Sequence, residues 1–431
     1  MKLGGRLQAA IEVLEEVEGR KRPVAEALKD WGRNHRFAGS GDRSAIGNIV
    51  YDALRSRASH AWRMGADSPR ALAMGAMAFD WDKSADDIAA MIAEDTHAPA
   101  PLSDEESAAI KARSLADAPF WVKGNIPEWL EGPFLETFED EALSEALAFA
   151  KRPPVDIRVN TLKSSVDKVA KELSRFNPKH TKLSSTCLRF PAGPGDYRQP
   201  NIQGDPAFRK GFYEVQDEGS QIVSSLIFPG KGEQVLDYCA GAGGKTLAMA
   251  ARMENKGQIY AYDMDAARLA PIVDRLSRAG VRNVQTRTPN EGVLDDLVGR
   301  MDRVVVDAPC TGTGTWRRRP ETKWKLTEEQ LDKRVEEQQI ALAQARHFVR
   351  PGGFLVYITC SVLPAENEEQ IYHFVASNPD FELVSAGEVW QDLYGFEAPQ
   401  PWSADMMSVT LTPASTGTDG FYFAVMERRS D

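Results

Sequence analysis

The chain has 431 residues, of which 42% are hydrophobic and 27% are charged, and its formal net charge is −11. These values are typical of a globular protein with two or three domains, and they exclude wholesale non-specific binding to nucleic acid, although a local basic patch can still hold a phosphate backbone. No apolar run approaches the roughly 20 residues of a membrane span, and the first residues carry acids where a secretory signal would be apolar, so we expect a cytoplasmic protein without membrane contact.

Residues 1–115 are predicted to form an all-helical N-terminal domain. Apolar residues recur there at helical spacing, first at Leu7, Ile11, Leu14 and Val17 and again at Ile46, Ile49, Val50 and Leu54. Basic residues gather between positions 20 and 57, whereas positions 80–106 are acidic. A solvated helix face explains both runs, and RNA binding by the basic end is the alternative.

Residues 116–216 are predicted to form a small α+β domain. The expected strands are 155–163, 186–190 and 211–215, and the expected helix is 166–176. The basic residues of this region are Arg158, Lys163, Lys179 and Lys182. An RNA-binding platform and an ordinary connector domain explain the pattern equally well.

Residues 217–431 alternate between strand and helix, which predicts a doubly wound α/β sheet. The expected strands are 234–237, 258–262, 283–286, 303–306, 354–358, 381–384 and 420–426. The expected helices are 218–227, 245–253, 266–279, 327–349 and 365–376. The long helix opens on the capping box at Thr327, and Pro351–Gly353 is predicted to stop it.

A glycine-rich loop joins the first of these strands to its helix. It runs Cys239, Ala240, Gly241, Ala242, Gly243, Gly244 and Lys245. A phosphate-binding P-loop needs glycine where Cys239 stands, and a dinucleotide fingerprint survives only in part. Asp263 follows the next strand at the spacing that suits ribose hydroxyls, so we expect a nucleoside here; a tight turn needed only for packing is the alternative.

Two cysteines follow the ends of apolar strands. Asp307 and Cys310 come after the strand at 303–306, and Cys360 comes after the strand at 354–358. Ligands of open parallel sheets bind outside the carboxyl ends of the strands, so both thiols are expected to face one cleft. A thiolate that adds to carbon 6 of cytosine makes carbon 5 nucleophilic enough to accept a methyl group. Asp307 would pair with the base edge, and Lys245 would polarise the same region.

Several motifs together resemble the Nop/Sun (RsmB-like) family of RNA cytosine-5 methyltransferases. They are DAPCTGTG at Asp307, YITCS at Tyr357, CAGAGGKT at Cys239, RVNTLK at Arg158 and YEVQDEGSQ at Tyr213, with agreement at Glu366–Glu368 and Asp419–Phe421. The resemblance covers residues 120–431. It implies a Rossmann-like methyltransferase sheet, mostly parallel with an antiparallel last strand, together with the small α+β insert and the all-helical N-terminal domain.

The same resemblance implies the cofactor and the roles of the site residues. S-adenosyl-L-methionine would lie on Cys239–Lys245, Asp263 and Asp307. Cys360 would be the nucleophile, and Cys310 would help to release the product. The sequence also departs from the family pattern, because Gly241 and Ala242 replace an alanine–proline pair and Thr288 replaces an acid. Asn290 is the candidate substitute on the adenine side.

The N-terminal region shows a second, looser resemblance. The first hundred residues resemble an RNA-binding domain of the NusB antitermination type, through Asp42–Arg43 and the helix after them.

Basic residues lie just beyond the Cys310 loop, at Arg317, Arg318, Arg319, Lys323 and Lys325. We expect them to meet phosphates that flank a flipped cytosine. Trp316 and Trp324 would stack on bases or pack beneath the loop.

The leading hypothesis is an S-adenosylmethionine-dependent RNA cytosine-5 methyltransferase that acts on ribosomal RNA. A tRNA cytosine-5 methyltransferase and a non-catalytic RNA-binding or ribosome-assembly factor are the alternatives, and a nicotinamide dehydrogenase fits only the glycine turn. The four cysteines, of which Cys187 is the first, show no Cys-x-x-Cys spacing. We therefore expect reduced thiols, no metal and no disulfide, in a monomer whose partner is RNA.

Overall fold

The protein is described by a computed structural model that covers residues 1–112 and 114–430. The chain divides into two compact units. The N-terminal unit contains residues 1–153, 192–199 and 316–325, and the sheet unit contains residues 154–191, 200–315 and 326–431. The three-domain division at positions 115 and 216 stays a prediction.

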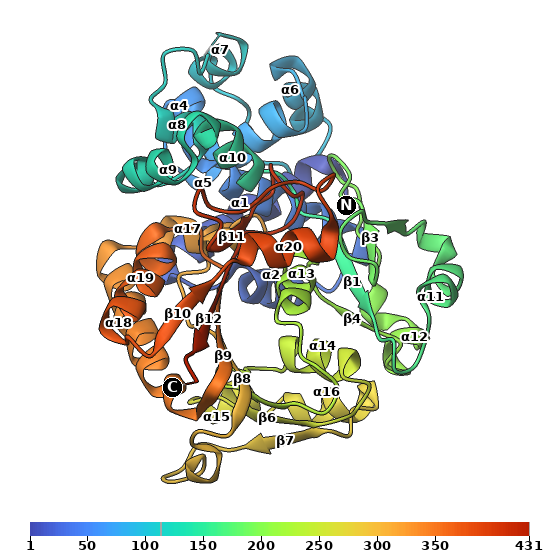
Figure 1. The fold of residues 1–431 in the computed structure, drawn as a ribbon. Coiled ribbons are helices and arrows are strands. Elements are labelled where there is room, and N and C mark those ends of the chain that lie inside the picture. Colours follow the sequence, from blue (N-terminus) through green and yellow to red (C-terminus); the bar gives the residue numbers. More distant parts are fainter. Residues whose placement is uncertain (113, 431) are drawn as a thin grey trace. The chain divides into compact units, whose positions relative to one another are not determined.

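The N-terminal unit is helical (Figure 1). Its elements are α1 (Leu3–Arg20), α2 (Val24–Asn34), α3 (Ser40–Arg55), α4 (Arg57–Met64), α5 (Pro69–Gly75), the π-helical turn η1 (Ala76–Asp80), α6 (Ala85–Ala93), α7 (Asp104–Ala112), α8 (Phe120–Gly124), the 3-10 turns η2 (Glu128–Leu130) and η3 (Glu139–Glu141), α9 (Glu131–Phe138), α10 (Ala142–Phe149) and α17 (Pro320–Lys325). The predicted apolar stripe of α1 is buried, with Leu7 and Leu14 fully inaccessible. This confirms the helical prediction for the first hundred residues. None of the described helices is long and apolar enough to cross a membrane.

The sheet unit contains a small antiparallel sheet in the order β2-β3-β1-β4. Its elements are β1 (Val155–Val159), α11 (Val166–Glu172), η4 (Ser174–Phe176), β2 (Lys179–His180), β3 (Cys187–Phe190), η5 (Ile202–Gly204), α12 (Pro206–Arg209) and β4 (Tyr213–Val215). Ile157, Leu188 and Tyr213 lie in its core. The strands predicted near 155, 186 and 211 are therefore confirmed, each shorter than expected.

The larger sheet of this unit has eight strands within the described residues. Its strands are β5 (Gln234–Asp237), β6 (Gln258–Tyr262), β7 (Val284–Arg287), β8 (Met301–Asp307), β9 (Val349–Thr359), β10 (Phe381–Val384), β11 (Ser408–Leu411) and β12 (Phe421–Arg428). The order is β10-β12-β9-β8-β5-β6-β7, and β11 pairs with β12. Strands β5 to β9 run parallel, whereas β12 is antiparallel to β9, β10 and β11. The predicted fold class is confirmed.

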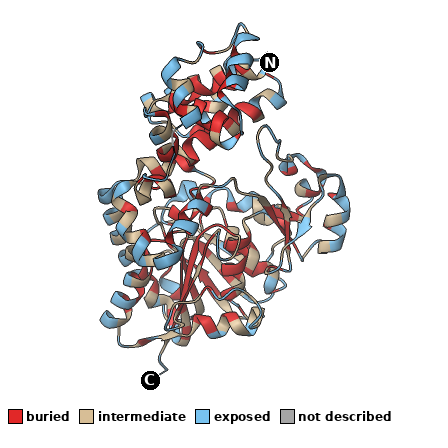
Figure 2. Ribbon diagram, turned by 90° about the horizontal axis from the view of Figure 1, so that it is seen from above, coloured by how far each residue is buried: buried red, intermediate tan, exposed pale blue. Residues whose placement is uncertain are grey.

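Helices cover both faces of this sheet, and its central strands are buried (Figure 2). The helices and turns of this part are α13 (Glu218–Leu226), α14 (Gly244–Arg252), α15 (Ala266–Leu269), α16 (Ile272–Ala279), η6 (Asp295–Leu297), η7 (Thr313–Thr315), α18 (Glu328–Ala345), η8 (Arg346–Phe348), η9 (Pro364–Glu366), α19 (Glu368–Ser377) and α20 (Ala386–Tyr394). Side chains of α18 and α19 pack with Val304 and Leu355 on one face. Side chains of α13, α14 and α20 pack with Val305 and Val356 on the other. Because β8 and β9 are buried on both faces, their sequences are continuous apolar runs.

Two helix boundaries differ from the prediction. The helix expected at 266–279 is broken into α15 and α16, and Pro271 stands between them. The helix expected to reach 349 ends at Ala345, and Pro351–Gly353 lies inside β9. Strand β9 pairs with β8 on both sides of these residues and shifts its register there. Gly352, at a φ of +70°, therefore serves a bulge in a strand and does not end the helix.

Candidate active site

The two strand-end cysteines lie side by side. Strands β8 and β9 are parallel neighbours, with Asp307 paired to Ile358, so the chain leaves both strands at the same edge of the sheet. The Sγ atoms of Cys310 and Cys360 are 3.4 Å apart, and both residues are half-buried. The hydrogen bond to the Cys360 thiol, together with burial, raises the pKa of Cys310 well above its ordinary value. Cys310 therefore keeps its proton.

Two glycines shape the loop that carries Cys310. Gly312 has a φ of +73°, and a Cβ atom there would lie 3.9 Å from the Cys360 sulfur. The Gly314 N–H donates to the Cys360 carbonyl at 2.9 Å, and its own carbonyl accepts from the Gly420 N–H at 2.8 Å. A Cβ atom on Gly314 would stand 2.3 Å from the Gly420 oxygen, so only glycine fits. The loop is thereby fixed to the ends of β9 and β12.

Glu366 also holds the Cys310 loop in place through hydrogen bonds. Its carboxylate accepts from the Thr311 N–H at 2.7 Å and from the Gln338 amide at 3.0 Å, and the same amide also donates to the Pro309 carbonyl. Burial raises the pKa of Glu366. No site role is predicted from the sequence for Glu366 or Gln338. The motif at Glu366–Glu368 was the only sequence signal for the first, and nothing in the sequence pointed to the second.

Lys245 and Asp307 form an ion pair beside the cysteines. The Lys245 Nζ donates to Asp307 Oδ2 at 2.6 Å. The lysine side chain is only 6% exposed, whereas the Asp307 side chain is 35% exposed. Lys245 stands in the first turn of α14, directly after the glycine loop, and β5 and β8 are adjacent strands. The pair therefore joins the glycine loop to the cysteine edge, and Asp307 can reach a ligand.

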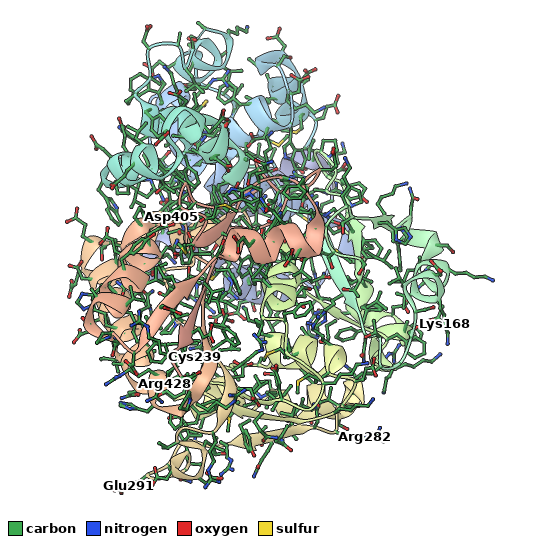
Figure 3. The ribbon with its side chains drawn as sticks, in the orientation of Figure 1. Lys168, Cys239, Arg282, Glu291, Asp405 and Arg428 are labelled. Carbon is green, nitrogen blue, oxygen red and sulfur yellow. The ribbon has the colours of Figure 1, made fainter. Side chains whose placement is uncertain are left out.

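The glycine loop turns over the end of β5. Gly241 and Gly243 have φ values of +49° and +81°, which favour glycine. The Gly241 N–H donates to Asp263 Oδ2 at 2.9 Å, and this bond ties the loop to the acid after β6. A Cβ atom on Gly241 would lie 3.8 Å from the Arg268 guanidinium and 3.8 Å from Asp263 Oδ2, so both side chains stand beside the loop. Cys239, labelled in Figure 3, has its pKa raised by burial and remains a thiol.

Two arginines from outside the glycine loop donate hydrogen bonds to its carbonyl oxygens. Arg158 of β1 donates to the Gly244 carbonyl at 3.0 Å and also to the Gln216 side chain. Arg275 of α16 donates to the Ala242 carbonyl at 2.7 Å and pairs with Glu214. The Arg158 side chain is buried, and burial lowers its pKa to about 10. Arg158 therefore braces the glycine loop, and the idea that it forms part of an RNA platform is wrong.

Asp237, the last residue of β5, lies beneath the loop. Its side chain is fully buried, and Thr246 donates to Oδ2 at 2.6 Å. Its Oδ1 has no hydrogen-bond partner among the described residues. Burial raises the pKa of this carboxyl to about 7. Asp237 is thus a buried acid with an unsatisfied oxygen directly under the predicted cofactor loop.

The adenine-side candidate lies in the loop after β7. Strand β7 pairs with β6, with Arg287 opposite Tyr262, so this loop leaves the same sheet edge as Asp263. Thr288 and Asn290 are both exposed, and Glu291, the next residue, projects outward in Figure 3. The described structure gives the Asn290 side chain no bond to Asp263 or to the glycine loop, so its role stays a prediction.

Known proteins are similar to this chain in sequence. Residues 224–427 match the family model described as 16S rRNA methyltransferase RsmB/F. The probable ribosomal RNA small subunit methyltransferase B of Synechocystis sp. is 31% identical over 315 residues, which cover 70% of this chain and 67% of that protein. The chain belongs to the RsmB/F methyltransferase family. The matched part spans about two thirds of the length of these curated relatives.

Solved structures show the same architecture. The crystal structure of PH0851 covers 99% of this chain and 100% of its own, with a TM-score of 0.74 and 25% identity. A methyltransferase homolog protein from Pyrococcus horikoshii covers 72% of this chain and 97% of its own, with a TM-score of 0.58 and 29% identity. The likeness of PH0851 to this RsmB/F chain thus extends beyond the residues that match the family model.

The basic segment of this RsmB/F chain lies within the N-terminal unit. Trp316 is buried and stacks on Phe134, with ring centroids 5.9 Å apart. The Lys323 Nζ donates to the Arg55 carbonyl at 3.0 Å, and burial together with the nearby Arg55 charge lowers the pKa of Lys323 to about 7. Lys325 Nζ donates to the Arg22 carbonyl, and Trp324 Nε1 donates to the Leu54 carbonyl. The prediction that this segment meets RNA phosphates is wrong for the buried Lys323, and it stays a prediction for the half-buried Lys325.

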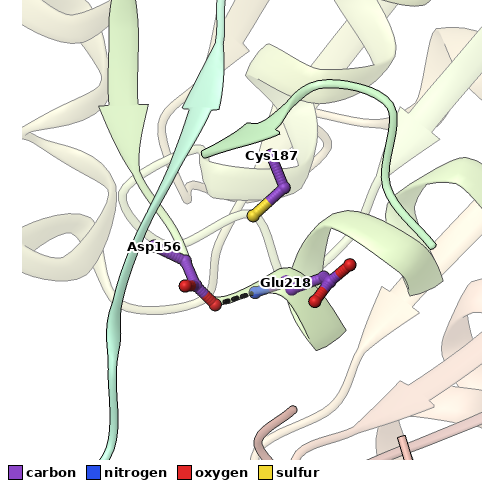
Figure 4. Close-up of side chains that lie close together, drawn as sticks. All are labelled: Asp156, Cys187 and Glu218. Atoms are coloured by element: carbon purple, nitrogen blue, oxygen red, sulfur yellow. Dashed lines mark hydrogen bonds between the residues drawn. The ribbon is translucent and has the colours of Figure 1, made fainter. Parts of the chain in front are cut away.

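One cluster of possible metal ligands lies between the small sheet and the start of α13. Asp156, Cys187 and Glu218 are buried with their ligand atoms within 4.8 Å of one another (Figure 4). The Arg189 guanidinium pairs with Asp156 at 2.7 Å and with Glu218 at 3.2 Å. The Asp156 carboxylate also accepts from the Glu218 N–H at 3.1 Å. A cation would have to displace Arg189, so the cluster is an ion-pair network.

Proposed function

We propose that the protein transfers a methyl group from S-adenosyl-L-methionine to carbon 5 of a cytosine in RNA, through a covalent adduct of Cys360. The observation that carries this proposal is the 3.4 Å separation of the two sulfurs at adjacent strand ends, beside the glycine loop. Membership of a ribosomal RNA methyltransferase family supports RNA, and ribosomal RNA in particular, as the substrate.

The residues of the glycine loop fit the methyl donor. The Asp263 carboxylate stands beside Gly241, with lone pairs left for ribose hydroxyls. The unsatisfied Oδ1 of Asp237 suits a donor group of the ligand. We infer that Cys239–Lys245, Asp263 and Asp307 hold the donor, with Asn290 on the adenine side. When bound, S-adenosylmethionine supplies an electrophilic methyl group on a sulfonium.

Cys360 acts first in this mechanism. Its thiolate forms a carbon–sulfur bond at carbon 6 of cytosine, and the electron pair of the former double bond becomes available at carbon 5. Asp307 and Lys245 are placed to bind the base edge and to stabilise the charge that develops on the ring. Carbon 5 would then form a bond to the methyl group that S-adenosylmethionine held on Cys239–Lys245 would supply, and a neutral thioether would remain.

Cys310 assists the second half of the reaction, in which the adduct breaks down and releases the product. A water molecule takes the proton from carbon 5, and the electron pair of that carbon–hydrogen bond restores the ring double bond as the carbon–sulfur bond to Cys360 breaks. Cys310 keeps its own proton and lies in contact with the departing sulfur. It can therefore protonate or hydrogen-bond the leaving Cys360 thiolate. Without that help the adduct would persist.

The test is methyl transfer by Cys360→Ala to ribosomal RNA purified from cells that lack the protein. Wild-type protein should methylate a cytosine that bisulfite sequencing identifies, and Cys360→Ala should lose at least about 10³-fold in rate because the attack on carbon 6 is removed. Calorimetry with S-adenosylmethionine should give the same affinity for both proteins. A variant that methylates cytosine at the wild-type rate contradicts the covalent mechanism, and methylation confined to tRNA would move the substrate to that RNA.

A further inference from the structure

The N-terminal unit contains a cavity of its own, separate from the residues of the proposed active site. The cavity measures about 620 Å³ and is lined by α4, η1, α8, the end of α10 and the loop at 192–195, all within that unit. Pockets for small ligands and nucleotides span about 300–1,000 Å³. The cavity is therefore large enough for a ligand and not merely a packing defect.

The charge of this cavity opposes that of the protein. Its charged lining residues are the cations Arg63, Lys123, Lys151 and Arg152 and the acids Asp52 and Asp80. The whole chain carries a net charge of −11, yet here cations outnumber acids by two. Arg152 and Asp52 pair with each other. The ammonium groups of Lys123 and Lys151 form no hydrogen bond or ion pair within the described residues, so they are available to an anion.

A buried histidine stands in the wall of the same cavity. The His60 side chain is 1% exposed, and neither ring nitrogen has a hydrogen-bond partner among the described residues, although Nε2 lies 3.2 Å from Asp80 Oδ2. A Cβ atom on Gly75 would stand 2.8 Å from the His60 ring, so the glycine makes room for the imidazole. An unsatisfied buried donor or acceptor costs about 1–3 kcal/mol. A ligand that hydrogen-bonds the ring would recover that cost.

Apolar side chains complete the lining. The Phe79 ring faces the cavity and carries the Arg63 guanidinium 3.3 Å from its centroid. Leu147 is 42% exposed although it is a large apolar residue. Single-stranded nucleic acids are bound by this combination of lysines for the backbone with aromatic and guanidinium planes for the bases. A protein partner would need a broader apolar surface than this concave site offers.

We propose that the cavity binds a phosphodiester of single-stranded RNA on Lys123 and Lys151, with the adjoining base against Phe79 and Leu147. The choice of RNA as the source of the phosphate rests on the proposed function. The N-terminal unit would then hold a nucleotide of the RNA substrate that is not the cytosine undergoing methylation.

The test uses the full-length protein and a fluorescent uridine oligonucleotide, which contains no cytosine and cannot be a substrate. Lys123→Ala/Lys151→Ala should bind it about tenfold more weakly at moderate salt. The slope of log Kd against log salt should also fall by about 0.7, because the variant loses one single-strand phosphate contact, which contributes roughly 0.7. Lys29→Ala/Lys83→Ala, which removes two exposed lysines elsewhere on the unit, is the matched control and should keep the wild-type slope.

A second variant tests the cavity without a change of charge. Ala192→Trp places a bulky ring in the lining and should weaken binding as the lysine pair does, while circular dichroism shows that the fold is intact. If both cavity variants bind the oligonucleotide like the control, the proposal is overturned. If the cavity variants still bind the oligonucleotide but no longer bind free adenosine monophosphate or inorganic phosphate, the RNA assignment is overturned. The readout is binding of an oligonucleotide that contains no cytosine, so it does not depend on methyl transfer, and failure of the methyltransferase proposal is distinguishable from failure of this one.

Discussion

The sheet unit holds two clusters in which cysteine lies near acid, and they differ in almost every physical respect. Cys310 and Cys360 follow the carboxyl ends of parallel strands and are half-buried. Cys187 lies within the antiparallel strand β3 and is 1% exposed, and burial beside Asp156 and Glu218 raises its pKa. The same residue types are therefore accessible at a strand end and sealed within a strand.

The acids of the two clusters also differ in how they are satisfied. The carboxylates of Asp156 and Glu218 are neutralised by Arg189. Glu366, beside Cys310, accepts hydrogen bonds from neutral donors, and burial raises its pKa. Arg189 compensates the charge of the first cluster, whereas Glu366 in the second holds the loop that carries Cys310. The predictions below test that division.

The largest effect is expected at Cys310. Cys310→Ala should leave the attack of Cys360 intact but lose at least about 10³-fold in turnover, because elimination of the adduct lacks its proton donor. The trapped enzyme should migrate with its RNA on a denaturing gel, and the band should disappear in Cys310→Ala/Cys360→Ala. Full turnover by the single variant, with no adduct, would contradict the role of Cys310.

A smaller effect, on stability, is expected at Arg189. Arg189→Met leaves Asp156 and Glu218 buried without a counter-charge, which should lower the free energy of unfolding by about 3 kcal/mol. Urea unfolding measures the change. Arg429→Met breaks an exposed pair with Glu382 and is the matched control, with an expected cost below about 1 kcal/mol. Equal midpoints for the two variants would show that the Arg189 network does not stabilise the fold.

The sequence predicted most of the sheet and its cysteine edge because both depend on local patterns. Strands β5, β6 and β10 begin and end where the apolar runs do. Each predicted site residue from Cys239 to Lys245, with Asp263 and Asp307, lies at the edge of the sheet where the cysteines stand, because parallel strands place their carboxyl ends together. The roles given to these residues stay proposals.

Long-range contacts account for what the sequence did not predict. Lys323 looks like a surface cation in a basic run, yet its ammonium donates to the Arg55 carbonyl, 268 positions away. Pro351–Gly353 look like a helix stop, yet pairing with β8 draws them into a strand. Arg158 holds the glycine loop across 86 positions. Neither hydrophobic periodicity nor charge patterning contains such information, because each depends only on neighbours in sequence.

Asp237 should make stability depend on pH in a defined direction. Its pKa is raised from 3.8 to about 7 in the folded protein, so the unfolded chain ionises first as pH rises. The contribution of the neutral Asp237 carboxyl to the free energy of unfolding is fully present below about pH 4 and is lost between pH 4 and 7. Asp237→Asn should therefore become more stable relative to wild type as pH rises, by about 3 kcal/mol between pH 4.5 and 8. Urea midpoints from pH 4.5 to 8 measure the difference. If wild type and Asp237→Asn differ by the same amount at every pH, the raised pKa of Asp237 is excluded.

The smallest effect is expected at Cys187, although the substitution is chemically the same as at Cys310. Cys187→Ala removes one sulfur from a packed interior, so it should cost about 1 kcal/mol of stability through the small cavity left behind. Methyl transfer should stay within about twofold of wild type, and no RNA adduct should accumulate. Activity measured beside Cys310→Ala makes the comparison direct. A loss of turnover at Cys187 similar to that at Cys310 would mean that accessibility at a strand end does not separate the two clusters.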